Sequence, residues 1–225
     1  MSSMTDRVLH RVTLEQIAAA NAIHDEHMPG WASTDRALTL VAASVPGHDL
    51  DTVTVKAAVV DRLYYTRHYR LGDAIDRIVT VMADPTADAV GMVESIAKTK
   101  VGDKFHWYWS FASKYSHWFV DDDLPIYDSW AIRGVSYHFG RMNWRTTAYR
   151  DFAEHVYALR EASGLGCSIR EMDRYLWMSG MYRGWVGTED RAKLGLSGEV
   201  VALFGSREAS IRRALTTLLG EMPSP

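Results

Sequence analysis

A chain of 225 residues, 47% of them hydrophobic, is long enough to bury a core of its own, and we expect one compact unit and a monomer. No run of about 20 apolar residues occurs, and the first ten residues lack the apolar centre of a secretory signal, so we expect a cytoplasmic protein with no membrane partner. The single cysteine, Cys167, excludes an intramolecular disulfide and a cysteine-ligated metal cluster.

The net charge of −3 conceals an uneven distribution along the chain. Residues 1–97 carry 8 basic and 13 acidic side chains, residues 98–150 carry 8 and 5, and residues 151–225 carry 9 and 10. The positive excess therefore lies in the middle of the chain. This pattern is compatible with phosphate binding there, although solvated lysines produce the same pattern.

Hydrophobic periodicity predicts helices along almost the whole chain. Thr13 with Gln16, and Ser168 with Glu171, have the spacing of a capping box at a helix start. The predicted helices cover residues 14–23, 35–44, 52–69, 73–82, 86–97, 129–141, 144–162, 168–179 and 206–219.

Three further expectations concern individual segments. In the predicted helix 52–69, Val55, Val59 and Leu63 recur at helical spacing and are expected to face the core. The segment 98–104 is expected to be a basic loop, and 199–204 (EVVALF) is the one place where the pattern admits a strand. The helix that starts after Ser168 is expected to end at Gly180.

The stretch 107–130, WYWSFASKYSHWFVDDDLPIYDSW, combines a lysine, an aspartate and much of the aromatic surface of the chain. Lys114 lies within a predicted helix, and Asp128 ends a proline-containing connection at the start of the next one. An amine and a carboxylate beside flat apolar side chains are suited to covalent chemistry on a planar ligand. We therefore interpret this stretch as a candidate reaction site.

Read as SFASK, a helix and then PIYD, the stretch resembles the helix-hairpin-helix DNA glycosylases. In that superfamily a hairpin of the form GVGxK enters a helix, and a short connection ends in VD at the next helix start. Lys114 falls at the position of the catalytic lysine of bifunctional members such as 8-oxoguanine DNA glycosylase, and Asp128 falls at that of the catalytic aspartate. Ser110 and Ala112 replace the hairpin glycines, and the spacing from Lys114 to Asp128 is shorter than usual in the family.

The resemblance implies a fold and an activity. It implies an all-α protein of two intimately packed helical bundles with a cleft between them, one formed by residues 55–151 with a degenerate hairpin and the other by 1–54 plus 152–225. It implies excision of a modified or damaged base from double-stranded DNA by base flipping. Asp128 would stabilise the sugar cation, and attack by Lys114 would add AP-lyase activity through a Schiff base. No cofactor or metal is expected.

The same resemblance assigns binding roles to a larger set of residues. Aromatic side chains would form the pocket for the flipped base, and the end of the helix 52–69 would fill the gap in the duplex. The expected pocket residues are Tyr64, Trp107, Trp109, Trp118 and Trp130. The expected DNA contacts are Tyr65, Thr66, Arg67, His68, Ser110, Ser113, Arg133 and Arg141.

Each assignment has a structural alternative. Asp128 can be only a helix cap, Lys114 only a surface contact, and the large aromatic residues only core. Two further functions therefore stay open at this point. One is a glycosylase that acts on hypermodified phage bases, such as glucosylated hydroxymethyl bases, in antiviral defence, and the other is a non-catalytic DNA-binding module with the same fold.

Overall fold

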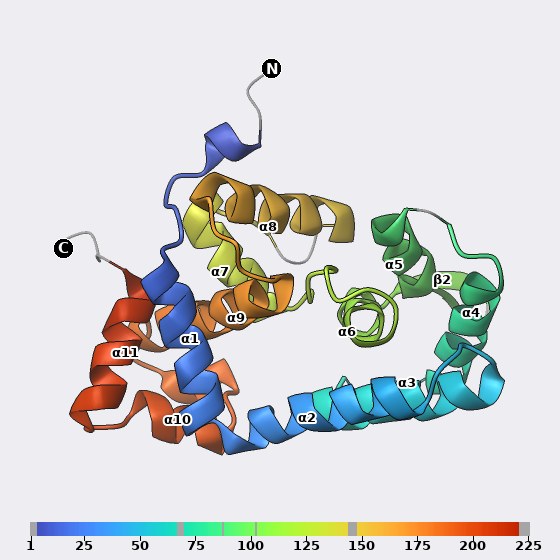
Figure 1. Cartoon of the computed structure of the whole chain (residues 1–225), viewed down its shortest axis with the longest axis horizontal. Coiled ribbons are helices and arrows are strands. Elements are labelled where there is room, and N and C mark those ends of the chain that lie inside the picture. Colours follow the sequence, from blue (N-terminus) through green and yellow to red (C-terminus); the bar gives the residue numbers. More distant parts are fainter. Residues whose placement is uncertain (1–3, 67–69, 87, 102, 144–147, 221–225) are drawn as a thin grey trace. The chain divides into compact units, whose positions relative to one another are not determined.

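The computed structural model describes residues 4–66, 70–86, 88–101, 103–143 and 148–220. Helices make up most of these residues, which confirms the predicted all-α class (Figure 1). None of the described helices is long and apolar enough to span a membrane. The chain divides into two compact units, of which the first comprises residues 1–33, 128–147 and 154–225, and the second 34–127 and 148–153.

The first unit packs around the helices α1, α7, α9 and α11. The capping boxes predicted at Thr13 and Ser168 are both present and start α1 and α9. Buried side chains from these helices, among them Ile23, Val135 and Leu176, form its core. Its elements are the 3-10 helix η1 (Thr5–Arg7), α1 (Leu14–His27), α7 (Ser129–Phe139), α9 (Ile169–Val186), the 3-10 helix η2 (Arg191–Leu194), α10 (Gly198–Phe204) and α11 (Ala209–Leu219).

The second unit is built from four helices and a short hairpin of strands. Its core includes Val60, Ile78, Ile96 and Tyr115. Its elements are α3 (Leu50–Tyr64), α4 (Leu71–Ala83), α5 (Ala89–Ala97), β1 (Lys98–Val101), β2 (Lys104–Trp107) and α6 (Trp109–Phe119). The helices α2 (Pro29–Ser44) and α8 (Tyr149–Ser163) contain residues of both units.

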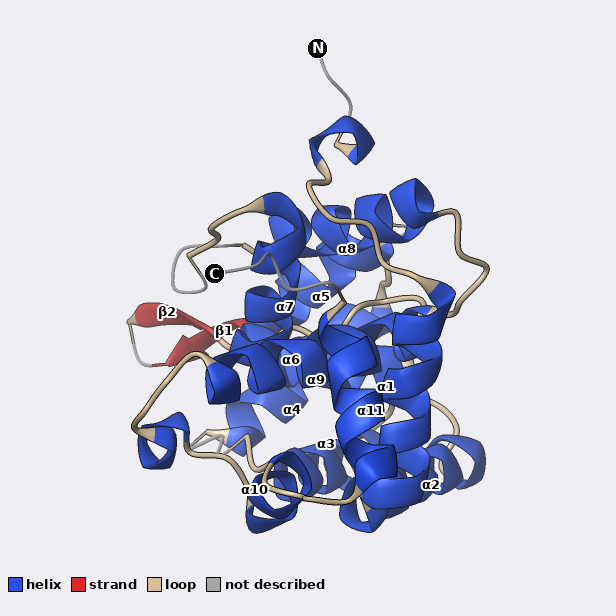
Figure 2. Cartoon of the chain, turned by 90° about the vertical axis from the view of Figure 1, so that its left-hand side faces the viewer, coloured by secondary structure: helices blue, strands red, loops and turns tan. Residues whose placement is uncertain are grey.

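The two predictions about strand and loop were wrong. The segment EVVALF lies in α10, where Ser197 caps the helix start and Val200, Leu203 and Phe204 are buried at helical spacing. The expected basic loop contains β1, which pairs antiparallel with β2 and is drawn red in Figure 2. Cross-strand pairing with aromatic residues outweighs the low strand propensity of the lysines here.

The buried face of α3 also differs from the prediction. Val53, Ala57 and Val60 are fully buried, whereas Val55 is 46% exposed. The helix carries two apolar stripes, and only packing against neighbouring helices decides which of them becomes core. The helix ends at Tyr64, five residues before the predicted end.

A close crossing of two helices defines the first unit. α9 continues through Gly180, which was predicted to end it, and crosses α7 at this point (Figure 1). A Cβ atom on Gly180 would lie 2.0 Å from the carbonyl oxygen of Trp130, and one on Gly134 would lie 2.3 Å from that of Leu176. Because both clashes are with backbone atoms, no side-chain rearrangement would relieve them. Glycine at these positions lets the two helix backbones approach each other directly.

We predict that Gly180→Ala lowers the free energy of unfolding by about 3 kcal/mol, the upper part of the range for overpacking a well-packed core. The matched control is Gly72→Ala in α4, because a Cβ atom there meets no atom within 4 Å. That control should be neutral or slightly stabilising. Chemical denaturation of the two variants beside the wild type measures the difference, and equal stabilities would contradict a close backbone contact.

A buried histidine joins the N-terminal segment to the same pair of helices. His138 of α7 is fully buried; its Nδ1 lies 2.5 Å from the carbonyl oxygen of His10, and its Nε2 lies 3.1 Å from the hydroxyl of Tyr175. Since a carbonyl only accepts, Nδ1 carries the proton and Nε2 accepts from Tyr175. Burial lowers the pKa of His138 to about 4, and the nearby Arg183 adds to that effect.

The lowered pKa of His138 makes the stability of the folded chain depend on pH. The unfolded chain binds a proton at His138 near pH 6.5, and the folded chain binds one only near pH 4. The contribution of neutral His138 to the free energy of unfolding is therefore complete above about pH 6.5 and falls as the pH drops towards 4. The expected loss is about 3 kcal/mol over that window. Denaturation of wild type and His138→Gln at pH 7 and pH 4 should give a smaller pH-dependent loss for the variant. An identical loss would exclude His138 as its source.

Candidate functional site

Lys114 of α6 is a buried amine. Its side chain is on the same helix face as Ser110, one turn earlier, and Nζ donates a hydrogen bond of 2.6 Å to the Ser110 hydroxyl oxygen. Only 6% of the residue is exposed. The ammonium also lies 5.3 Å from the centre of the Tyr64 ring, at the end of α3. The helix, the serine and the tyrosine therefore fix the position of the amine.

The second unit brings further predicted pocket residues to Lys114. The indole nitrogen of Trp118 donates a hydrogen bond of 2.9 Å to the hydroxyl of Tyr64. Trp118 is 6% exposed and lies four residues after Lys114 on α6. Two of the five predicted pocket residues, Tyr64 and Trp118, thus contact each other, and Tyr64 lies beside the candidate catalytic amine.

A second pair of pocket residues lies at the start of α6. The Trp107 and Trp109 rings stack with their centres 4.7 Å apart and their planes 21° apart, and Trp109 lies 6.5 Å from the ring of Tyr127. Trp107 is 49% exposed. These aromatic rings form a continuous row from β2 to the residue before Asp128.

The connection from α6 to Asp128 is anchored by buried polar groups. The hydroxyl oxygen of Ser113 accepts a hydrogen bond of 2.9 Å from the backbone N–H of Tyr127. His117 Nδ1 lies 2.8 Å from the carbonyl oxygen of Leu124, and the Tyr149 hydroxyl donates to the carbonyl oxygen of Pro125. Ser113 is fully buried, so it holds this connection and is not on a surface that DNA can reach in this conformation.

The anchoring role of Ser113 and His117 was missed in the sequence. The two residues are one helical turn apart, and both are almost completely buried. A buried polar side chain needs a hydrogen-bond partner. That spacing was a usable signal for anchoring, but it did not identify the partner.

Asp128, in the first unit, is the N-cap of α7. Its backbone is extended (φ −150°, ψ 170°), and its Oδ1 accepts hydrogen bonds of 2.8 Å from the N–H groups of Trp130 and Ala131. The residue is half-buried.

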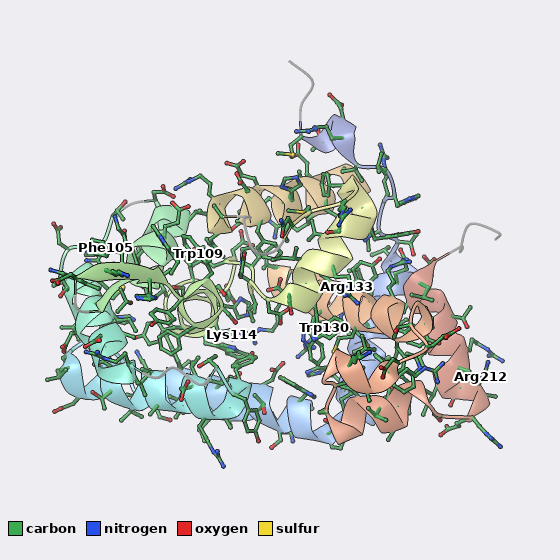
Figure 3. The ribbon with its side chains drawn as sticks, turned by 180° about the vertical axis from the view of Figure 1, so that it is seen from behind. Phe105, Trp109, Lys114, Trp130, Arg133 and Arg212 are labelled. Carbon is green, nitrogen blue, oxygen red and sulfur yellow. The ribbon has the colours of Figure 1, made fainter. Side chains whose placement is uncertain are left out.

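Two other predicted residues lie on α7 and contact each other. The guanidinium of Arg133 lies 4.9 Å from the centre of the Trp130 ring (both labelled in Figure 3), and both side chains lie against Gly184 of α9. Arg133 is exposed. Arg141, also exposed, follows the end of α7.

The end of α3 has an unusual backbone. Tyr65 is 67% exposed and adopts a left-handed conformation (φ 50°), which among the described residues only glycines otherwise share. The guanidinium of Arg62 lies 5.8 Å from its ring centre, and the Thr66 hydroxyl donates to the carboxylate of Asp61. The predicted DNA contacts Arg67 and His68 lie outside the described residues.

The positions that correspond to the hairpin glycines are helical. Ser110 and Ala112 both lie within α6, and the Ser110 hydroxyl is bound to Lys114. The degenerate hairpin expected at these positions is therefore absent, because the helix already begins at Trp109. Among the described residues, no group of three or more His, Cys, Asp or Glu side chains is placed to hold a metal ion.

Part of the chain matches a protein-family model. The family model HI_0787_N, described as an N-terminal domain, matches residues 13–123, just under half of the chain. The matched segment contains Lys114 and ends before Asp128. No curated protein and no solved structure matches the chain.

Proposed function

We propose that the chain is a DNA glycosylase that excises a modified or damaged base from double-stranded DNA by base flipping, with AP-lyase activity through Lys114. The observation that carries the proposal is the buried amine of Lys114, held by Ser110 beside the aromatic ring of Tyr64. A neutral amine is the nucleophile that forms a Schiff base with a sugar carbon. A lysine used only to contact phosphate would be exposed.

In the proposed reaction the flipped base leaves with the electron pair of its bond to C1′ and takes up a proton. The carboxylate of Asp128 stabilises the positive charge that develops on the sugar. Because both hydrogen bonds from α7 are accepted by Oδ1, we assign Oδ2 to the sugar. Nζ of Lys114 then bonds to C1′, the amine loses a proton and the sugar ring opens to a Schiff base. Loss of a C2′ proton with departure of the 3′ phosphate breaks the strand.

The base pocket and the duplex contact rest on aromatic residues. Tyr64 and Trp118, which contact each other beside Lys114, supply ring faces for an extruded base. Tyr65 is exposed at the end of α3, and its left-handed backbone is typical of functional positions. We assign it to the gap that the flipped nucleotide leaves in the duplex.

A non-catalytic DNA-binding module is the second candidate, because Asp128 already has a structural role as the cap of α7. Substitution by asparagine separates the two functions. Asparagine caps helices as well as aspartate does, so Asp128→Asn should leave thermal unfolding and DNA affinity nearly unchanged. It should reduce single-turnover excision by at least about 100-fold, since the lost charge acts in the transition state.

The substrate for this measurement comes from a panel of duplex oligonucleotides with defined lesions and phage-type modified bases. The matched control is Asp49→Asn, because Asp49 caps α3 through the same kind of bonds to the N–H groups of Asp51 and Thr52. The control should excise like the wild type. Excision retained in Asp128→Asn, or no excision of any base by the wild type, would contradict the proposed function.

A further inference from the structure

The hairpin β1–β2 presents a face that mixes aromatic and basic side chains. Lys98 pairs with Trp107, and Lys100 pairs with Phe105, across the two antiparallel strands. Paired residues lie on the same face of a hairpin, and alternate residues of one strand share that face. These four side chains therefore project together; Figure 3 labels Phe105 on this hairpin and Trp109 at the start of α6.

This face is open to solvent, whereas the opposite face contains the buried Thr99 beside the exposed Lys104 and His106. Phe105 is 56% exposed and Trp107 49% exposed, whereas Thr99 on the opposite face is 1% exposed. The ammonium of Lys98 lies 4.8 Å from the ring centre of Phe105 and 5.6 Å from that of Trp107. Large aromatic residues exposed beside cations are typical of a binding surface and contribute little to a core.

We propose that this hairpin face binds single-stranded DNA, with an unpaired base stacked on Trp107 and the neighbouring phosphates bound by Lys98 and Lys100. Aromatic stacking platforms among basic side chains are the usual means of binding single strands without sequence preference. Charge complementarity supports this occupant, because the segment 98–107 contains three lysines and a single acidic residue, Asp103.

The platform is held in place before any ligand arrives. One face of the Trp107 ring stacks on Trp109, which begins α6 and in turn neighbours Tyr127. A base on the other face would therefore bind a ring whose orientation is already fixed, which reduces the entropy lost on binding. Within the second unit, the row of rings leads to Tyr127, the residue before Asp128. The role of this single strand in a reaction rests on the proposed function, but binding of the single strand to the hairpin can be measured without excision.

The test is the anisotropy of a fluorescein-labelled oligothymidylate, titrated with protein at several salt concentrations. Trp107→Leu should weaken binding about tenfold, since loss of one stacked base costs about 1–3 kcal/mol, whereas Trp107→Phe should stay close to the wild type. Each of Lys98→Gln and Lys100→Gln should reduce the slope of log affinity against log salt by about 0.7. The control Arg212→Gln removes an exposed charge from α11 in the first unit and should leave the slope unchanged.

Three results would overturn the inference. These are no binding by the wild type, equal binding by Trp107→Leu and Trp107→Phe, or an unchanged salt slope in both Lys98→Gln and Lys100→Gln. Circular dichroism of each variant establishes that it is folded. If the wild type binds the single strand as expected but excises no base, the proposed function fails and the inference about the hairpin stands. If it excises a base but its binding to the single strand does not depend on the hairpin, the inference fails and the proposed function stands.

Discussion

The direct approach of two helix backbones at Gly134 and Gly180 is the constraint on which the first unit depends. A side chain at either position would penetrate a carbonyl group of the facing helix, so the crossing of α7 and α9 has little freedom to shift. The N-terminus of α7 carries Asp128, whose orientation is fixed in turn by two backbone N–H groups. Because the crossing holds α7 in place, it also holds the carboxylate of Asp128 in place. A charge that stabilises a transition state has to be held in this way before the reaction begins.

In the second unit, α6 has the corresponding role. One face of the helix holds the amine of Lys114 through Ser110, and Ser113 and His117 fix the connection that leads to Asp128. The start of the same helix supports the stacked rings of Trp107 and Trp109. A single helix therefore positions the proposed nucleophile, Trp118 of the proposed base pocket and the proposed single-strand platform. Accordingly, several polar residues of its sequence, WSFASKYSHWF, are buried.

Features that depend on residues close in sequence were predictable. The capping boxes at Thr13 and Ser168 need only a partner three residues away, and both form. Features that depend on distant partners were not. The bond from Tyr127 to Ser113 spans 14 residues, and no local pattern specifies it. Gly180 was interpreted as a helix end because glycine both ends helices and permits close crossings, and only the facing helix decides between these roles. Likewise, the lysines of β1 indicated a loop, and the segment is a strand only because it pairs with the aromatic residues of β2.

The most direct test of covalent chemistry at Lys114 is borohydride trapping with a duplex that contains an abasic site. If the amine attacks C1′, reduction of the Schiff base leaves a stable bond between protein and DNA, and peptide mapping by mass spectrometry should place it on Lys114. The substitution Lys114→Gln should abolish the adduct, whereas Lys193→Gln, which removes an exposed amine from η2 in the first unit, should retain it. An adduct on another lysine, or an equal yield from Lys114→Gln, would contradict the account.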